Sequence, residues 1–393
     1  MNRLHRTSVA SFATTLALLI GCGGNVNLGG KGSNADSNGN DDPPTTTDPD
    51  PSASTSVVTL PEVVLESLAV AGDYLYFTGY KHTQTLGLYR CEKARCKATL
   101  KLLVKGNFGF PQVFDDRLGL TRFGEGNFDL VSFGLPDASD PEEVLKNLPA
   151  LQPTPALFRE DFVYFSVLMD SNIYRCARPT CAAGPERIAP ILARNYVELH
   201  ADGDFLFWSD EFFIKRVRSD GQGPVESLLP DELLSAAPAT AFDPNGRPAD
   251  SVESIAIGDG VLYASVARSQ NGESSDSSSP HEVVGWPLAG GASQVFFKSD
   301  TLLSGVAIVD GELMWLGPST KIPSTGAATI SSCRVEACEA TYRELGEVKP
   351  ENAVFAADEH DLYWIEAVAQ MKGGFVEGFK VEEIRRAPRL PKP

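Results

Sequence analysis

Six of the seven cysteines form three pairs of identical spacing, and this pattern is the clearest sign of chemistry in the chain. Four residues separate the members of each pair, which are Cys91–Cys96, Cys176–Cys181 and Cys333–Cys338. This spacing suits two cysteines that face each other across a four-residue hairpin loop, within reach of a disulfide. A zinc site is the alternative, but it needs four converging ligands, and no histidine accompanies these pairs. An even count in an oxidising compartment favours three local disulfides.

The seventh cysteine, Cys22, follows a short apolar segment at the start of the chain. The run from Val9 to Ile20 comes after two arginines and is shorter than the roughly 20 residues that span a bilayer, which is typical of a signal peptide. Residues 19–22, Leu-Ile-Gly-Cys, resemble the bacterial lipobox. The resemblance implies cleavage before Cys22, acylation of its thiol, and a protein anchored in the cell envelope, most simply at the outer membrane. An ordinary signal peptide with a chance cysteine is the alternative.

The chain divides into three parts by composition. We assign residues 1–21 to the signal peptide, 22–56 to a disordered tether and 57–393 to the folded part. The tether consists of Gly, Asn, Ser, Asp, Pro and Thr with almost no apolar side chains, so it cannot bury enough surface to offset its ordering entropy. A flexible coil of this length spans about 30 Å, which would hold the folded part away from the membrane.

The charge balance is acidic and excludes some classes of partner. The sequence carries 34 Lys and Arg against 52 Asp and Glu, a net charge of −18, and most of the excess lies in the folded part. Nucleic acids and anionic bilayers both reward basic surfaces, so we expect neither as a partner, apart from the lipid anchor in the membrane. A solvated acidic surface is the simpler interpretation than an acidic binding site.

A short sequence motif that recurs seven times determines the predicted fold. An alternating apolar run, an acidic turn and a second run with an aromatic pair predict two antiparallel strands, as in residues 353–358 and 361–366. Third and fourth strands follow in several copies. The repeats start near 66, 112, 156, 197, 254, 305 and 353. Acids recur at the first turn, where we expect a carboxylate to cap backbone N–H groups: Asp73, Asp116, Asp202, Asp259, Asp310 and Asp358.

Four strands at this period are typical of the blades of a β-propeller. The phrases Tyr-Trp-Ile-Glu (363–366), Phe-Trp-Ser-Asp (207–210) and Tyr-Phe-Thr-Gly (76–79) resemble degenerate YWTD repeats. That family builds six-bladed propellers, whereas seven copies are counted here. We therefore predict an all-β, seven-bladed propeller, with a six-bladed ring and an insertion at 112–148 as the alternative. The last repeat lacks a fourth strand, and residues 56–60 precede the first, so this N-terminal strand is expected to close the last blade.

Four long segments are predicted to share one face of the ring, opposite the disulfides. They are 229–251, 267–281, 317–329 and 367–377, and such loops carry most binding contacts in folded proteins. The candidate binding residues on this rim are Asp231, Glu232, Asp243, Arg247, Asp250, Arg268 and Lys321. Variable surface loops without a ligand are the alternative.

Catalytic and metal-binding patterns are missing from the sequence. The histidines are scattered, and no nucleophile elbow, zincin motif or phosphate-binding loop is present. The aromatic residues of the second strands are expected to pack between blades, with Trp286 and Phe375 closer to loops. The first strands that line the channel are mostly apolar, with Glu198 and His200 as the exceptions, so a calcium-dependent hydrolase or lyase is only a distant alternative.

These patterns together predict a monomeric, non-catalytic binding module on the cell envelope that needs no cofactor. Its partner would be another envelope protein or an extracellular ligand. A scaffold for envelope assembly, like the propeller lipoprotein that assists outer-membrane protein assembly, is the second hypothesis.

Overall fold

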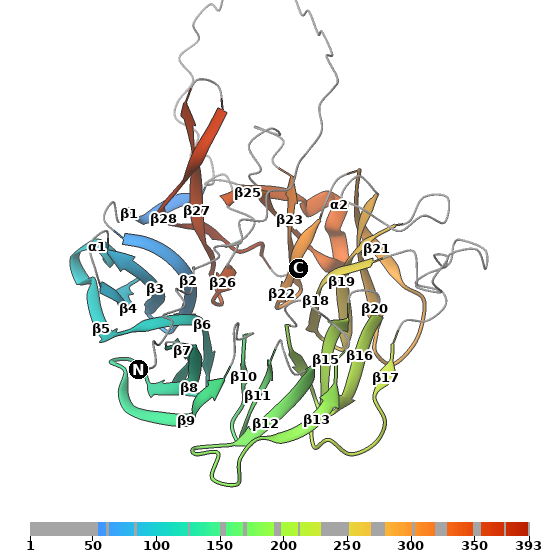
Figure 1. Ribbon diagram of the computed structural model, residues 1–393. Helices are drawn as coiled ribbons and strands as arrows, with labels where there is room; N and C mark the ends of the chain where they lie inside the picture. Colours follow the sequence, from blue (N-terminus) through green and yellow to red (C-terminus); the bar gives the residue numbers. More distant parts are fainter. Residues whose placement is uncertain are drawn as a thin grey trace, which may run out of the picture. The chain divides into compact units, whose positions relative to one another are not determined.

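Seven four-stranded antiparallel sheets form a ring, so the chain is a seven-bladed β-propeller (Figure 1). Residues 107–149 form a regular blade and not an insertion, which confirms the seven-bladed prediction. The computed structural model describes residues 54–391 apart from these ranges: 60–62, 82–84, 125, 150–154, 168–170, 192–197, 211–212, 229–250, 269–279, 301–302, 319–327, 349–354 and 373–374. The signal peptide and most of the tether, including Cys22, lie outside the described residues.

The first four blades follow the chain in order, each with its first strand innermost. Blade 1 consists of β2 (Val63–Ala71), β3 (Tyr74–Lys81), β4 (Thr85–Glu92) and β5 (Lys101–Lys105). Blade 2 consists of β6 (Asn107–Phe114), β7 (Arg117–Phe123), β8 (Asn127–Gly134) and β9 (Ser139–Pro149). Blade 3 consists of β10 (Leu157–Phe158), β11 (Phe162–Val167), β12 (Asn172–Ala177) and β13 (Glu186–Pro190). Blade 4 consists of β14 (His200–Asp202), β15 (Phe205–Asp210), β16 (Phe213–Arg218) and β17 (Glu226–Ser227).

The remaining blades complete the ring, and helices are confined to single turns in the described part of the chain. Blade 5 consists of β18 (Ser251–Gly258), β19 (Val261–Ala267), β20 (His281–Pro287) and β21 (Gln294–Ser299). Blade 6 consists of β22 (Ser304–Val309), β23 (Glu312–Pro318), β24 (Ala328–Arg334) and β25 (Arg343–Val348). Blade 7 contains β26 (Phe355–Ala357), β27 (Asp361–Lys372) and β28 (Phe375–Pro388). The short helices are α1 (Cys96–Thr99), η2 (Val335–Ala337) and α2 (Cys338–Thr341), and no helix among the described residues is long and apolar enough to cross a bilayer.

The N-terminal strand closes the ring, as the sequence predicts. Strand β1 (Thr55–Thr59) pairs with β28 as the outermost strand of blade 7, with Val58 opposite Ile384. It begins one residue before the predicted start at Ser56. In Figure 1, this blue strand lies against the red strands from the other end of the chain. The pairing leaves the outer edge of β28 covered and holds the first and last blades together.

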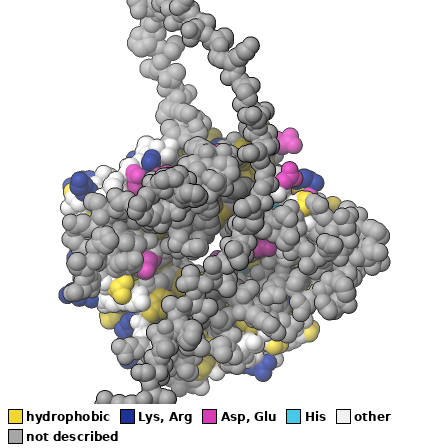
Figure 2. All heavy atoms as spheres, turned by 45° about the horizontal axis from the view of Figure 1, so that its top comes forward, with side chains coloured by type: hydrophobic (Ala, Val, Ile, Leu, Met, Phe, Trp, Pro, Cys, Tyr) yellow, Lys and Arg dark blue, Asp and Glu magenta, His cyan; other side chains and the backbone are white. Residues whose placement is uncertain are grey.

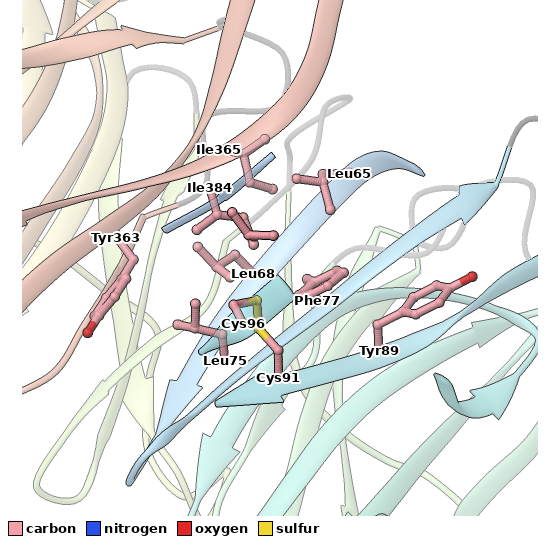
Figure 3. Packing of buried hydrophobic residues seen from close by; sticks show 11 residues of the cluster. Leu65, Leu68, Leu75, Phe77, Tyr89, Cys91, Cys96, Tyr363, Ile365 and Ile384 are labelled. Carbon is pink, nitrogen blue, oxygen red and sulfur yellow. A yellow bond between two sulfur atoms is a disulfide. The ribbon is translucent and has the colours of Figure 1, made fainter. Parts of the chain in front are cut away.

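The apolar core consists of seven clusters, and each cluster joins two neighbouring blades. Figure 3 shows the cluster at the closure, where Tyr363, Ile365 and Ile384 of blade 7 meet Leu68 and Phe77 of blade 1. Eight aromatic residues in the middle of the second strands are at most 3% exposed, which confirms that they pack between blades. They are Tyr76, Tyr164, Phe207, Trp208, Tyr263, Trp315, Tyr363 and Trp364.

One hydrogen bond recurs in all seven blades and defines the two faces of the ring. The residue just after the third strand donates its N–H to the carbonyl of the last residue in the turn between the first and second strands, at 2.7–3.0 Å. The donor–acceptor pairs are Lys93–Asp73, Leu135–Asp116, Arg178–Asp161, Ser219–Asp204, Leu288–Gly260, Val335–Gly311 and Arg389–His360. These two sets of turns therefore share one face, which we call the disulfide face. The loops between second and third strands leave from the opposite face, which we call the long-loop face.

The acids at the first turn serve two purposes. Asp358 caps its turn as predicted, because its Oδ1 accepts the N–H groups of His360 and Asp361 at 2.8 Å each. Asp259 and Asp310 instead take the left-handed backbone conformation beside Gly260 and Gly311, which gives two-residue type I′ turns. Asp202 is not in the turn at all. It is the last residue of β14, and Gly203 takes the positive φ of 52°.

The three predicted disulfides are present, with Cα–Cα distances of 4.6, 5.0 and 4.8 Å. Their surroundings differ from the predicted hairpin, because the second cysteine does not lie on the fourth strand. Cys96 and Cys338 begin the single-turn helices α1 and α2, and Cys181 lies in a loop. Each disulfide thus closes a small loop on the disulfide face and restricts the conformation of that loop.

Removing one disulfide should lower stability by a modest, measurable amount. Replacing Cys333 and Cys338 together by Ser is expected to lower the free energy of unfolding by roughly 2 kcal/mol, the value for so short a closed loop. Both side chains are buried in the cluster between blades 5 and 6, so part of the loss would come from packing. Denaturant unfolding of the oxidised wild type and the variant measures it. A variant as stable as the wild type would contradict this estimate.

The predicted long loop at 367–377 is largely strand. β27 and β28 continue their pairing to Lys372 opposite Phe375, so a two-stranded hairpin extends beyond the blade (Figure 1). Two of the other predicted loops leave the ring between paired residues on the long-loop face, whereas the predicted loop at 229–251 lies outside the described residues up to Asp250. Ala267 pairs with His281, and Pro318 pairs with Ala328.

Candidate functional site

The channel at the centre of the ring contains a cavity of about 540 Å³. Innermost segments of blades 1 to 6 line it, and most of the lining is apolar or backbone. The described lining residues are Ser67, Leu68, Phe110, Pro111, Gln112, Pro155, Ala156, Leu157, Glu198, Leu199, His200, Ala201, Ile257, Gly305, Val306 and Ala307. Its volume falls in the range of sites that bind small molecules, roughly 300 to 1,000 Å³. The apolar channel with Glu198 and His200 as exceptions agrees with the sequence prediction.

Glu198 and His200 lie at different depths on blade 4. His200 begins β14 opposite Phe207, whereas Glu198 precedes the strand and lies nearer the long-loop face. Their side chains are 66% and 19% exposed, and Nε2 of His200 lies 3.9 Å from Oε1 of Glu198. Burial lowers the pKa of His200, and the Glu198 carboxylate offsets this only in part. The lowered pKa keeps the imidazole neutral near pH 7.

Gln112, the single amide side chain among the described lining residues, has a structural role. Its Oε1 accepts the N–H of Phe158 at 2.7 Å, and its Nε2 donates to the carbonyl of the same residue at 3.4 Å. One side chain thus satisfies the backbone of β10 and connects blades 2 and 3. Its hydrogen-bonding groups are occupied by the protein itself.

Phe110 has an unusual backbone conformation at the edge of the channel. Its φ is 54°, in the left-handed region that bulky residues rarely adopt. The register of β6 shifts between Gly109 and Gln112, so Phe110 lies in a β-bulge. Its ring is 37% exposed in the cavity lining and meets Phe123 nearly edge-on, with centroids 6.2 Å apart. The repeat pattern gives no sign of this residue, because the second copy of the motif is the most degenerate.

Of the seven predicted rim residues, Arg268 alone lies within the described part of the chain. Arg268 lies at the foot of the 269–279 segment, where its Nη2 is 2.9 Å from Oε2 of Glu282, and Lys298 approaches the other oxygen at 2.8 Å. Burial alone would raise the pKa of Glu282, but these two cations outweigh it and hold the pKa below its usual value. Arg268 is thus already paired. The other six candidates lie outside the described residues: Asp231, Glu232, Asp243, Arg247, Asp250 and Lys321.

Trp286 is the penultimate residue of β20 and therefore lies near a loop, as predicted, but it is not an exception to the packing between blades. It is 8% exposed and packs in the cluster between blades 4 and 5. The side chain of Phe375 lies outside the described residues. In the view of Figure 2, the described acidic and basic side chains are interspersed, without a large patch of one sign.

Arginine–aromatic pairs recur in blades 1, 3 and 4, and sequence reasoning missed them. An arginine of the third strand lies over the ring that begins the second strand, 4.3 to 5.0 Å from its centroid. The pairs are Arg90 over Tyr74, Arg175 over Phe162 and Arg216 over Phe205. Arg90 and Arg175 also donate to carbonyls in the next blade, Pro136 and Ser219. The repeated Tyr-Arg before the first two cysteine pairs was the available signal.

A buried ionic network holds the end of the chain against blade 6. Glu312 is fully buried, and its Oε1 accepts hydrogen bonds from Arg343 at 2.8 Å and Ser332 at 3.0 Å. Its Oε2 accepts the backbone N–H of Leu390 at 3.1 Å and lies 3.6 Å from Nε of Arg389. This network stabilises the disulfide face and leaves no group free for chemistry at Glu312.

An ion pair across the closure predicts acid sensitivity. Nζ of Lys93 in blade 1 lies 2.6 Å from Oδ2 of Asp358 in blade 7. Burial by itself would raise the pKa of Asp358, but the hydrogen bonds from Lys93, Asp361 and His360 hold it below the usual value. A lowered pKa in the folded state adds stability above the unfolded pKa of about 3.9, and that stability is lost as the pH falls through the folded value.

We therefore expect Lys93→Met to lower the free energy of unfolding by about 1 to 2 kcal/mol at pH 7, since it removes a hydrogen bond between charged groups. The difference from the wild type should shrink as the pH falls below about 4, where Asp358 becomes protonated in both proteins. Urea unfolding at a series of pH values measures this. A constant difference from pH 7 to pH 2 would contradict the assignment.

The described residues contain no cluster of metal-binding side chains. No three His, Cys, Asp or Glu side chains within the described ranges come close enough together to hold a metal ion. Glu198 and His200 make only a pair.

Comparisons with known proteins identify the fold and no family. No family model matches the chain, and neither does any curated protein. Among solved structures, the AfRom2 CNH domain matches with a TM-score of 0.54 and 10% identity over 86% of this chain and all of that domain. An oligogalacturonate lyase in complex with manganese gives the same TM-score and identity, over 86% of this chain and 93% of the lyase.

A third neighbour is a puromycin-hydrolyzing peptidase of Mycobacterium tuberculosis. It has a TM-score of 0.51 and 12% identity, over 80% of this chain and 51% of the peptidase. The neighbours thus include a lyase and a peptidase as well as a CNH domain. At these identities the likeness establishes the propeller fold alone.

Proposed function

We propose that this protein is a non-catalytic binding module, anchored to the cell envelope through lipid on Cys22 and acting as a monomer. The lipobox-like sequence at 19–22 and the polar tether that follows it support the anchor. Two or more acyl chains anchor a protein stably, because each buried CH₂ contributes about 0.8 kcal/mol. The propeller would then stand away from the bilayer and present its loops to an envelope protein or an extracellular ligand.

The proposal depends mainly on a difference between the two faces of the ring: one is held by many fixed contacts, and the other presents the long segments. On the disulfide face, the turns are held by the recurrent backbone hydrogen bond, the disulfides and the network around Glu312. On the long-loop face, the segments at 268–280 and 319–327 and the extended β27–β28 hairpin all leave neighbouring blades. Binding residues are commonly carried by loops on a rigid scaffold, and this arrangement provides both parts.

Affinity capture from envelope extract tests the binding face. The full-length protein, solubilised in detergent, should recover a specific partner, and replacing 269–279 by a short Gly-Ser turn should reduce the recovery at least tenfold. The matched control shortens 289–293, the third-to-fourth strand loop of the same blade on the disulfide face. The control should capture as the wild type does. Equal capture by all three proteins would contradict the proposal.

The anchor has its own test. Cys22→Ser is expected to abolish metabolic labelling with a palmitate analogue and to move the protein from the membrane to the soluble fraction. Cys91→Ser and Cys96→Ser together serve as the control, since those thiols are joined in a disulfide. Labelling that persists in Cys22→Ser would place the lipid on another residue and contradict the assignment of Cys22.

A further inference from the structure

The central cavity has an unbalanced negative charge. Glu198 is the single charged side chain among its described lining residues, and no Lys or Arg is included with it. The nearest ionisable neighbour is His200, which is neutral near pH 7. The Glu198 side chain is 66% exposed, so a ligand in the channel can reach its carboxylate, and no basic side chain of the described lining competes for it.

His200 adds a polar contact deeper in the same cavity. Its Nε2 is buried, and no group of the described residues forms a hydrogen bond with it. A buried nitrogen without a partner costs free energy, and a ligand with a polar hydrogen would recover it once the partly exposed ring of His200 turns this nitrogen toward the cavity. A bound group that reached both Glu198 and His200 would therefore lie along blade 4, with its polar end against these two residues.

Phe110 supplies an aromatic surface at this cavity. A bulky residue at positive φ costs about 1 to 3 kcal/mol, so the fold gives up stability to keep this conformation. A β-bulge is a common device for turning a side chain toward a site, and here it leaves the ring partly exposed in the lining. Aromatic rings attract cations through their faces and bind apolar groups equally well.

The kind of cation follows from the number of ligands. Glu198 and His200 provide two side-chain ligands within the described lining, whereas tight divalent sites use three or more from the protein. The rest of the lining is apolar and backbone, and the cavity of about 540 Å³ is much larger than a metal ion. An ammonium group attached to an apolar body satisfies the carboxylate, the imidazole, the ring and the apolar wall together.

We propose that the central cavity is a binding site for a small organic amine with an apolar group, held by Glu198, His200 and Phe110. The ammonium pairs with Glu198 and donates a hydrogen bond to the imidazole of His200. The apolar body lies against Phe110 and the inner strands of the neighbouring blades. This site is separate from the proposed partner surface on the long-loop face, so one can exist without the other.

Calorimetric titration of the full-length protein in detergent tests the site with simple probes. We expect 2-phenylethylammonium to bind at least tenfold more tightly than 2-phenylethanol, its neutral counterpart, and 3-phenylpropanoate not to bind. Glu198→Gln should remove the preference for the amine, and Glu160→Gln, which changes an exposed acid on the disulfide face, should keep it. Phe110→Gly, a residue that suits the left-handed backbone, should fold and weaken the amine at least fivefold.

The outcomes separate the alternatives. Equal binding of amine and alcohol, or an unchanged affinity in Glu198→Gln, would overturn the proposal. So would the absence of saturable amine binding up to the solubility of the probe. Tight binding of ZnCl₂ that the amine fails to compete with would show a metal site instead. The variant shortened at 269–279 should still bind the amine, so loss of partner capture and loss of amine binding can be told apart.

Discussion

Val58→Asp is expected to open the propeller. Val58 lies on the closing strand β1, is 3% exposed and packs in the cluster that joins blades 7 and 1. A carboxylate at this position has no cation beside it in the cluster, so the variant must either bury an unpaired charge or release the strand. Either outcome costs more than the 1.5 to 3 kcal/mol that burial of a valine contributes, and we expect a loss of at least 4 kcal/mol.

Hydrogen exchange and denaturant unfolding measure this effect together. Loss of β1 should leave the outer edge of β28 unpaired, so the amides of β28 that face β1 should exchange faster. Ser56→Asp, which changes an exposed residue of the same strand, should have little effect. If Val58→Asp keeps both wild-type stability and protection of β28, the closing strand does not hold the ring.

Glu312→Gln should produce the second large effect. The carboxylate lies at the centre of a network in which the side chains of Glu312, Arg343 and Arg389 are 0%, 6% and 5% exposed. Removing its charge leaves two arginines buried near it without their shared partner, which typically costs about 3 to 5 kcal/mol. Arg389 keeps hydrogen bonds to Asp358 and Val309, so the loss falls mainly on Arg343.

A double-mutant cycle separates the network from simple packing. Arg343→Met in the Glu312→Gln background should recover part of the lost stability, because it removes a buried charge that has lost its carboxylate partner. Glu339→Gln, on the exposed side of α2, should be neutral. Additive effects of the two network substitutions would show that Glu312 and Arg343 are not coupled.

The apolar alternation of the repeat was enough to predict the blades. Apolar residues at every second position of a strand face a neighbouring blade, whether the ring has six blades or seven. Periodicity alone therefore identifies the strands and their buried residues. The spare strand before the first repeat could be assigned to the last blade by counting, because an unpaired edge is unfavourable. The three disulfides could be predicted from the spacing of the cysteines, because each joins two residues that are close in sequence.

Other features depend on contacts between residues distant in the sequence, and a pattern cannot supply them. The strain at Phe110 comes from a bulge that brings its ring to the channel, and nothing in residues 107–114 indicates it. Glu312 and Arg389 are 77 residues apart in number and meet only because blade 7 returns the chain to blade 6. The run at 367–377 contains two glycines and was taken for a loop, yet pairing with a neighbouring strand extends it as a hairpin.

The sequence by itself therefore determined the number of blades, the closing strand and the sulfur pairs, since each depends on local periodicity or spacing. The repeat also placed Glu198 and His200 in the channel, but only the tertiary structure decided that Phe110 lines the same cavity. Phe110 belongs to blade 2, whereas Glu198 and His200 belong to blade 4. Phe110 and Glu198 are therefore 88 residues apart in the sequence. Their common position follows from the closure of the ring, a long-range property of the whole chain.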